Sequence, residues 1–157
     1  MKKIVVLSDT HRNKAAIEKL LPVMAESDYV IHLGDHAQDM KEYAETLRGK
    51  LITVDGNCDF FSSGTDELTF EAEEVRLFVC HGHKYGVKSS LDRILDRAEQ
   101  EKADIALFGH THNALSEIRR GIKLINPGCM TKYSPVKSYC YLLIDGKKSA
   151  DKIIEII

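Results

Sequence analysis

The chain has 157 residues, of which 43% are hydrophobic, and it carries 22 Lys and Arg residues against 24 Asp and Glu residues. This length and apolar content predict one folded domain over residues 1–157 rather than a disordered chain. No apolar run approaches the roughly 18 residues of a membrane-spanning helix, and the balanced charge argues against bulk binding of nucleic acid. The four cysteines form no Cys-x-x-Cys pair, and the run Ile4–Leu7 is too short for the core of a signal peptide. We therefore expect reduced thiols in a cytoplasmic protein.

The first part of the chain alternates short apolar runs with helical patterns. The runs Ile4–Leu7, Tyr29–Leu33 and Leu51–Val54 are rich in the residues that fill buried strands. Between them, apolar residues recur at helical spacing from Ile17 to Met24 and again from Met40 to Leu47. This β-α-β-α-β order predicts parallel strands joined by right-handed crossovers.

The second part of the chain predicts mainly strands. Alternating apolar residues between Leu68 and Val79 indicate a hairpin. A third helical stripe follows from Val87 to Ala98, with Ser89 and Asp92 spaced as a capping box. The remaining predicted strands are Ile105–Phe108, Ala114–Ile118, Ile122–Ile125, Tyr139–Ile144 and Lys152–Ile157.

These patterns together predict about ten strands and three helices. Ten strands are too many for one small sheet, because strongly twisted sheets usually hold about four to six strands. We therefore expect an α/β fold in which two sheets pack face to face, with the helices on the outside.

Five of the predicted strands run directly into side chains that bind metals. Ligands bind outside the carboxyl ends of parallel strands, so five such ends could bring these side chains into one pocket. Carboxylate, amide and imidazole groups suit divalent ions such as Mn, Fe, Co, Ni or Zn. The side chains are Asp9 and His11, Asp35 and His36, Asn57 to Asp59, His81 and His83, and His110 and His112.

The set is more informative than any of its members. A single Asp-x-His or Gly-Asp pair after a strand is common and is usually a turn. Two Asp, one Asn and four His exceed what one ion needs and suit two ions that share a carboxylate. His32 lies inside a predicted strand, so we expect it to pack or form hydrogen bonds rather than bind metal.

The order of these motifs resembles that of the calcineurin-like metallophosphoesterases, and in particular the small YfcE-type phosphodiesterase branch. The resemblance rests on Asp9-x-His11, Gly34-Asp35, Gly56-Asn57, His81 and Gly109-His110-x-His112, and it extends to Asn126-Pro127-Gly128. It implies a four-layer α-β-β-α sandwich, in which two mixed sheets pack face to face between flanking helices. It also implies a centre that holds two metal ions.

The resemblance assigns a ligand set to each ion. One ion would be held by Asp9, His11, Asp35 and His112, and the second by Asp35, Asn57, His81 and His110, with Asp35 bridging. We expect Mn²⁺ first, with Zn²⁺, Ni²⁺, Fe²⁺ and Co²⁺ as alternatives.

The implied activity is hydrolysis of a small phosphodiester. Two ions can share a water molecule and lower its pKa enough to give an attacking hydroxide near neutral pH. Asn57, Cys58, Asp59 and His83 are the catalytic candidates, and His36 is a further candidate acid. Many family members have His where Cys58 stands, in contact with phosphate or the leaving oxygen. Cys58 either takes part in catalysis or merely fills that space.

Two other functions remain open at this point. The eukaryotic retromer subunit resembles these enzymes and acts as a scaffold, but such relatives typically lose ligand positions and none is lost here. Enzymes that act on nucleic-acid ends carry extra domains or basic surfaces, and this chain has neither. Relatives are often dimers, so a homodimer is possible. The loops Phe60–Thr65 and Met130–Lys137 are expected to form pocket walls.

Overall fold

The computed structural model describes residues 1–60 and 62–157. One sheet of five strands is built from both ends of the chain, in the order β10-β9-β1-β2-β3. β1 is parallel to β2, and β2 is parallel to β3, as the β-α-β-α-β pattern predicts. β9 joins the other side of β1 as an antiparallel strand and continues into β10, so the sheet is mixed. The strands are β1 (Lys2–Leu7), β2 (Tyr29–His32), β3 (Leu51–Thr53), β9 (Ser138–Asp145) and β10 (Lys148–Glu155).

The second sheet also has five strands, in the order β4-β5-β6-β8-β7. β4 and β5 form the predicted hairpin, while β5, β6 and β8 run parallel to one another. β7 closes the sheet as an antiparallel edge strand beside β8. The strands are β4 (Glu67–Ala72), β5 (Val75–Cys80), β6 (Ile105–Leu107), β7 (Leu115–Arg119) and β8 (Ile122–Asn126).

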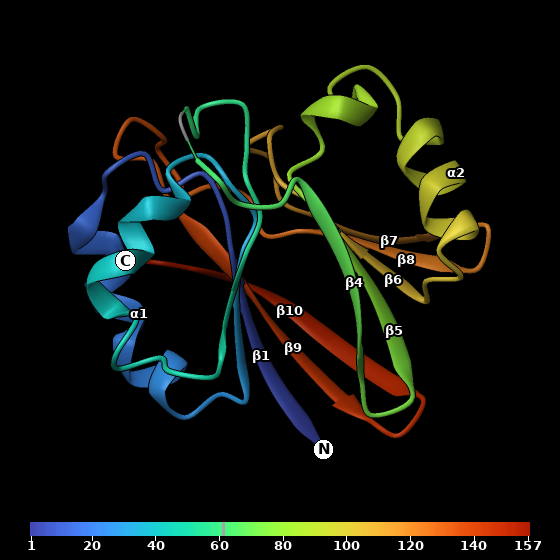
Figure 1. The fold of residues 1–157 in the computed structure, drawn as a ribbon, viewed down its shortest axis with the longest axis horizontal. Helices are drawn as coiled ribbons and strands as arrows, with labels where there is room; N and C mark the ends of the chain where they lie inside the picture. Colours follow the sequence, from blue (N-terminus) through green and yellow to red (C-terminus); the bar gives the residue numbers. More distant parts are fainter. Residues whose placement is uncertain (61) are drawn as a thin grey trace.

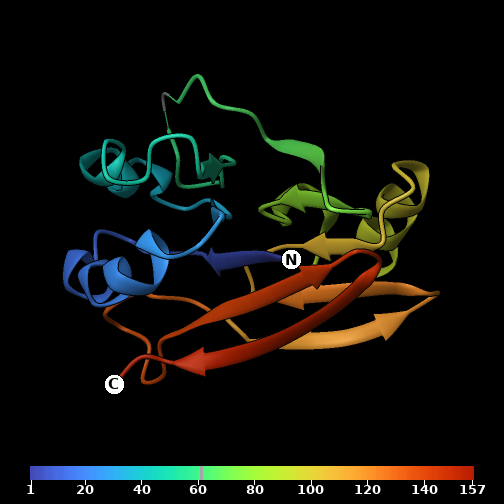
Figure 2. The ribbon, with the colours of Figure 1, turned by 90° about the horizontal axis from the view of Figure 1, so that it is seen from below.

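The two sheets pack face to face, and helices cover their outer faces, which gives the expected four-layer α-β-β-α sandwich. Figure 1 shows α1 (Lys14–Ala25) on one side of the paired sheets and α2 (Asp92–Gln100) on the other. The central core lies between the sheets, where Ile4 and Val6 meet apolar residues of β5 and β6. Figure 2 shows β9 and β10, in red, as a long antiparallel pair across the molecule. None of the helices in the described residues is long and apolar enough to cross a membrane.

The second predicted helix is wrong in type. Residues Ala37–Tyr43 form a 3-10 helix, which is followed by turns rather than by an α-helix. Met40 and Leu47 are nevertheless fully buried against β1 and α1, as the stripe predicts. Because a 3-10 helix has three residues per turn, apolar residues spaced by three fit it as well as they fit an α-helix.

The predicted start of the third helix is also wrong. The helix α2 begins at Asp92, its cap residue Leu91 makes no side-chain hydrogen bond, and Val87 lies in the preceding turn. Ser90 rather than Ser89 contacts Asp92, whose backbone N–H donates to Ser90 Oγ at 3.1 Å. The sequence placed the cap at Ser89, two residues before the observed cap residue Leu91, and Ser90 is the serine that contacts the first turn.

Candidate metal centre

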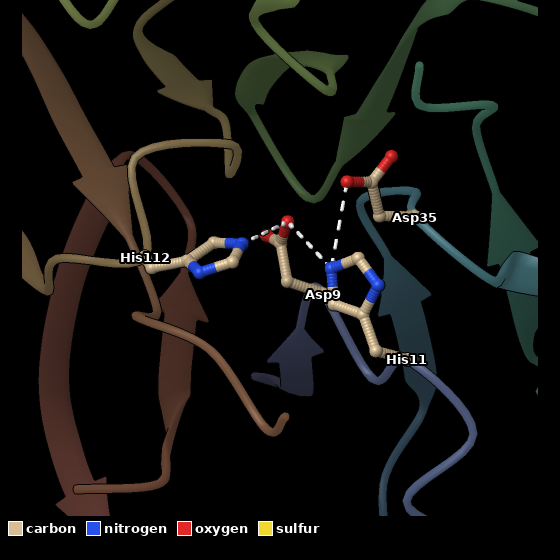
Figure 3. A group of neighbouring side chains, drawn as sticks. All are labelled: Asp9, His11, Asp35 and His112. Carbon is tan, nitrogen blue, oxygen red and sulfur yellow. Dashed lines mark hydrogen bonds and ion pairs between the residues drawn. The ribbon is translucent and has the colours of Figure 1, made fainter. Parts of the chain in front are cut away.

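The carboxyl ends of parallel strands from both sheets meet at one edge of the sandwich. Asp9 follows β1 in one sheet and His112 follows β6 in the other, yet Nε2 of His112 lies 3.0 Å from Oδ1 of Asp9. Nε2 of His11 lies 3.8 Å from the same oxygen (Figure 3). Two loops that are far apart in sequence therefore contribute to one cluster around a buried carboxylate.

Asp35 is shared by two groups of candidate ligands. One group joins it to Asp9, His11 and His112, and the other joins it to His81 and His110; within each group the ligand atoms lie within 4.8 Å of one another. Oδ2 of Asp35 lies 3.5 Å from Nε2 of His11, as Figure 3 shows, whereas Oδ1 lies 3.4 Å from Nε2 of His81. The two carboxylate oxygens thus face opposite groups, which is the arrangement of a bridging ligand.

The backbone fixes the orientation and tautomer of the His81 ring. Its side chain is fully buried, and its Nδ1 lies 2.7 Å from the carbonyl oxygen of Leu33. A carbonyl can only accept, so Nδ1 carries the proton and Nε2 presents a lone pair to the site. Nε2 faces two further acceptors, Oδ1 of Asn57 at 3.2 Å and Oδ1 of Asp35 at 3.4 Å. A cation among these three atoms would satisfy all of them.

The electrostatics of the cluster also suit a cation. Burial opposes the ionisation of Asp9, but His11 and His112 hold the pKa of this carboxyl well below its usual range. Burial and the neighbouring His81 lower the pKa of His110 to about 4, so its ring is neutral near pH 7. Asp9 instead raises the pKa of His11. A metal ion would therefore displace a proton from His11, since neutral imidazoles and ionised carboxylates are the forms that bind metals.

The backbone around the cluster is unusual. Five of the seven candidate ligands have positive φ angles: Asp9 at 54°, His11 at 42°, Asp35 at 60°, His110 at 67° and His112 at 62°. Residues other than glycine in this region cost about 1–3 kcal/mol each, and such residues concentrate at binding and catalytic sites. The fold therefore holds these loops in a strained conformation that turns their side chains inward.

A divalent ion fits the residues present. Nε2 of His11 is buried and makes no hydrogen bond with the described part of the chain. It points toward the carboxylates of Asp9 and Asp35 (Figure 3). A cation placed among these atoms would satisfy a buried ring nitrogen that makes no hydrogen bond, so both the donor set and this nitrogen match a metal.

Asp59 contacts the backbone of the site rather than its centre. Its carboxylate accepts hydrogen bonds from the backbone N–H groups of Asp35 at 2.8 Å, Ala37 at 2.9 Å and Gly56 at 2.8 Å. These bonds fix the loop that carries Asp35. Asp59 therefore positions Asp35 through the backbone.

The other sequence-predicted residues lie around the two groups. The Cys58 backbone N–H donates to Oδ1 of Asp35 at 2.8 Å, and burial and Asp35 raise the pKa of the Cys58 thiol to about 11. The His83 ring centroid lies 5.4 Å from that of His81. His36 packs against His11, with ring centroids 5.2 Å apart. His32 is buried and hydrogen-bonds with Thr10 and with the Gly34 N–H, as expected for a residue outside the ligand set.

Sequence reasoning missed several residues that support the site. Ser8 Oγ donates to Oδ2 of Asp9 at 2.5 Å, and the buried Asn126 donates from Nδ2 to the carbonyl oxygen of Gly109 at 2.9 Å and to Thr111 Oγ1 at 3.1 Å. Asn126 therefore holds the loop that carries His110 and His112. The sequence Asn126-Pro127-Gly128 contributed to the family resemblance but did not indicate what Asn126 contacts. The residues around Ser8 likewise do not indicate that it hydrogen-bonds with Asp9.

The candidate metal centre opens onto a cleft of about 640 Å³. The lining residues are His11, Arg12, His36, Gln38, Cys58, Phe60 and Tyr133. A second hollow of about 380 Å³ lies beside His11 and His112 and shares Tyr133 with the first. The loops predicted as pocket walls thus contribute Phe60 and Tyr133.

Sequence comparison places the chain among known proteins. Residues 1–149 match the profile of the calcineurin-like phosphoesterase superfamily domain. The probable metallophosphoesterase YsnB of Bacillus subtilis is 34% identical over 145 residues, which cover 90% of this chain and 84% of that protein. Phosphodiesterase YfcE of Escherichia coli K12 is 28% identical over 158 residues, covering 83% of this chain and 80% of that protein.

Solved structures show the same fold. A predicted phosphoesterase from Streptococcus pneumoniae superposes with a TM-score of 0.82 at 22% identity, covering 98% of this chain and 89% of that chain. Vps29 from Entamoeba histolytica, complexed with zinc, superposes with a TM-score of 0.78 at 18% identity and covers 98% of each chain. The chain therefore belongs to the calcineurin-like phosphoesterase superfamily.

Proposed function

We propose that this protein is a phosphodiesterase that uses two divalent metal ions to hydrolyse a small phosphodiester. The observation that carries the proposal is the position of Asp35, whose two carboxylate oxygens face separate groups of candidate ligands. The names of its curated relatives, metallophosphoesterase and phosphodiesterase, support the same activity. The four free cysteines support the cytoplasmic location that we also propose.

Each ion would have its own ligand set. Asp9, His11, Asp35 and His112 would hold one ion, and Asp35, Asn57, His81 and His110 the other. We propose Mn²⁺, although the same oxygen and nitrogen donors also suit Zn²⁺, Ni²⁺, Fe²⁺ and Co²⁺. When bound, such a pair of ions lowers the pKa of water and neutralises charge on phosphate oxygens.

The residues of the chain supply orientation and hold protons in place. The Leu33 carbonyl keeps the His81 proton on Nδ1, so that Nε2 faces the site. Asp59 holds the Asp35 backbone, and Asn126 holds the loop of His110 and His112. Because these partners are already in place, the phosphate would bind to a site that needs little reorganisation.

Cys58 bears on the choice of substrate. A thiol is a weaker proton donor to a leaving oxygen than the imidazole found in many relatives. We therefore propose that phosphodiesters with good leaving groups are preferred and that monoesters are poor substrates. If Cys58 only fills space, the Cys58→His variant will keep the same dependence on the leaving group. If the position acts in proton transfer, that variant will hydrolyse esters of poorer leaving groups better than the native chain does.

The direct test is hydrolysis of bis(p-nitrophenyl) phosphate and p-nitrophenyl phosphate by metal-free protein, with and without added Mn²⁺. We expect Mn²⁺-dependent hydrolysis with a higher kcat/KM for the diester, and loss of that activity in Asp35→Asn. Asp145→Asn is the matched control, because Asp145 is a largely exposed carboxylate at the end of β9. Comparable kcat/KM values for both esters would contradict the preference for diesters.

A non-catalytic scaffold is the second candidate function. The likeness to Vps29 complexed with zinc favours it. That protein has this fold and binds a metal ion, but its name does not describe an enzyme. Metal binding without hydrolysis of any phosphoester would support this function. The presence of all seven candidate ligands supports the enzyme instead.

A further inference from the structure

Two exposed aromatic side chains stand at the mouth of the candidate metal centre. Phe60 and Tyr133 are 74% and 85% exposed. Within residues 1–60 and 62–157, every other Phe and Tyr is buried or half-buried. Both exposed rings line the cleft of about 640 Å³ that also contains His11. Exposed apolar patches are uncommon on soluble proteins and often mark binding sites. The position of these rings beside the candidate centre therefore suggests that they bind a ligand.

Tyr133 is presented by an ordered loop. The loop begins at Met130, whose backbone N–H donates to the carbonyl oxygen of Ser8 at 3.2 Å, directly before Asp9. Within the loop, the Ser134 N–H donates to the carbonyl oxygen of Thr131 at 3.1 Å, and Ser134 Oγ donates to that of Val136 at 2.6 Å. The loop is thus fixed to the centre and holds the Tyr133 ring at the rim. A loop whose backbone is already held by hydrogen bonds loses less entropy on binding than a flexible loop does.

Phe60 is tied to the centre from the opposite side. It directly follows Asp59, whose carboxylate accepts the backbone N–H groups of Asp35 and Ala37. The position of Phe60 is therefore coupled to the loop that carries the shared ligand Asp35.

Arg12 adds a positive charge to the same cleft. Its backbone N–H donates to Oδ2 of Asp39 at 2.8 Å, which fixes the backbone next to His11. Its guanidinium forms no ion pair with any residue that the structure describes. A free guanidinium among the residues lining a cleft suits the oxygens of a phosphate ester, which it can bind with two parallel hydrogen bonds.

We propose that Phe60, Tyr133 and Arg12 form a subsite for the non-leaving side of the substrate, which carries a planar aromatic group of nucleobase size. The aromatic rings stack on this group, and Arg12 binds the adjacent phosphate oxygen. The proposal rests on the proposed phosphodiesterase function and narrows its substrate class to nucleotide-like diesters. Stacking of a base on aromatic side chains tolerates any base, so the subsite selects an aromatic ring rather than a particular sequence.

The test compares two diesters with the same leaving group. Thymidine 5′-p-nitrophenyl phosphate carries a nucleobase on its non-leaving side, whereas methyl p-nitrophenyl phosphate carries none. We expect the Mn²⁺-loaded native chain to favour the thymidine ester in kcat/KM by at least about tenfold. Tyr133→Ala and Phe60→Ala should bring this ratio toward one, and Tyr133→Phe should retain it because stacking needs the ring and not the hydroxyl.

Two further variants show whether the preference arises in this cleft. Ile118→Ala removes an apolar side chain that is 67% exposed from β7, outside the cleft, and should leave the ratio unchanged. Arg12→Ala should lower kcat/KM for both esters, because both carry the phosphate oxygen that it binds.

The results distinguish this inference from the function on which it rests. Hydrolysis of both esters with a ratio near one overturns the subsite and leaves the phosphodiesterase intact. Failure to hydrolyse either ester in the presence of Mn²⁺ overturns the phosphodiesterase itself. If Tyr133→Ala converts a dimer to a monomer in light scattering and leaves the ratio unchanged, the aromatic pair binds a second copy and the subsite is wrong.

Discussion

Nε2 of His112 lies 3.0 Å from Oδ1 of Asp9, although 103 residues separate the two in the chain. Asp9 extends from the central strand of one sheet, and His112 lies beyond the end of β6 in the other. The contact therefore depends on the packing of the two sheets as well as on the conformation of two loops. A substitution that displaces either loop should therefore weaken metal binding at the candidate metal centre.

Asp59→Asn tests whether Asp59 positions the shared ligand. The amide can keep one acceptor oxygen, but its NH₂ group cannot accept from the backbone N–H groups that now bind the carboxylate. We expect metal affinity to fall by about 10- to 100-fold, the usual effect of losing a residue that orients a ligand. Calorimetric titration of Mn²⁺ into metal-free protein measures it. Asp66→Asn, a change at a half-exposed carboxylate, is the control; unchanged affinity in Asp59→Asn would refute the positioning role.

Gly109→Ala tests the close approach of the two loops. A Cβ at this position would collide with Ser8 Oγ and lie 2.8 Å from Oδ2 of Asp9. We expect a loss of about 1–3 kcal/mol in the free energy of unfolding, together with weaker Mn²⁺ binding, because Asp9 must move. Urea unfolding of metal-free protein and a Mn²⁺ titration measure the two effects.

Gly49→Ala separates loop strain from crowding. A Cβ at Gly49 would meet no atom within 4 Å, but the residue has a φ of +75°. This variant should lose about 1 kcal/mol of stability and retain Mn²⁺ affinity. Equal Mn²⁺ affinity in Gly109→Ala and the native chain would show that the loops can separate without consequence.

Asp151→Asn tests an ion pair between strands of different sheets. Burial raises the pKa of Asp151, but the hydrogen bonds from Lys123 Nζ, 2.6 Å away, and from Ser116, together with the Lys123 charge, outweigh burial and leave the pKa below the usual value. A lowered pKa in the folded state means that the ion pair stabilises above the unfolded pKa of about 3.9 and that this contribution is lost as the pH falls through the folded value. Because Lys123 is partly exposed, we expect the variant to lose only about 1–2 kcal/mol near neutral pH.

The pH dependence of this loss is the informative result. The difference in Tm between Asp151→Asn and the native chain should be largest near neutral pH and should shrink below about pH 4. Thermal unfolding at a series of pH values measures it, and Asp145→Asn should show no such difference. A constant difference across the series would show that the charge of Asp151 contributes nothing.

The sequence predicted the strands, the two-sheet arrangement and the elements that carry the candidate ligands. The buried parallel strands were predictable because they combine a short apolar run with a polar exit, as at Ile4–Leu7 and Ile105–Phe108, and the β4–β5 hairpin because its apolar residues alternate. The segment from Met40 to Leu47 was not, because spacing by three and four residues does not separate a 3-10 helix from an α-helix. The 3-10 helix follows its cap residue His36, which has a φ of 66°. At its first residue, the Ala37 N–H donates to the Asp59 carboxylate.

The contacts that support the site could not be predicted from the sequence, for a different reason. Metal-binding side chains are recognisable by type, but the partner of each depends on the tertiary structure. The bond between Leu33 and His81 spans 48 residues and uses a backbone carbonyl, which every residue possesses. The loop Met130–Lys137 was expected to form a pocket wall, but the sequence did not indicate that Tyr133 is the side chain of this loop that lines the cleft beside His11.

We propose that Asp35 bridges two metal ions, and diffraction from crystals grown with Mn²⁺ would locate both. Anomalous scattering at the manganese edge should give two peaks, one on each side of the Asp35 carboxylate, with His11 and His112 at one and His81 and His110 at the other. A single peak, or peaks that do not contact Asp35, would contradict the account.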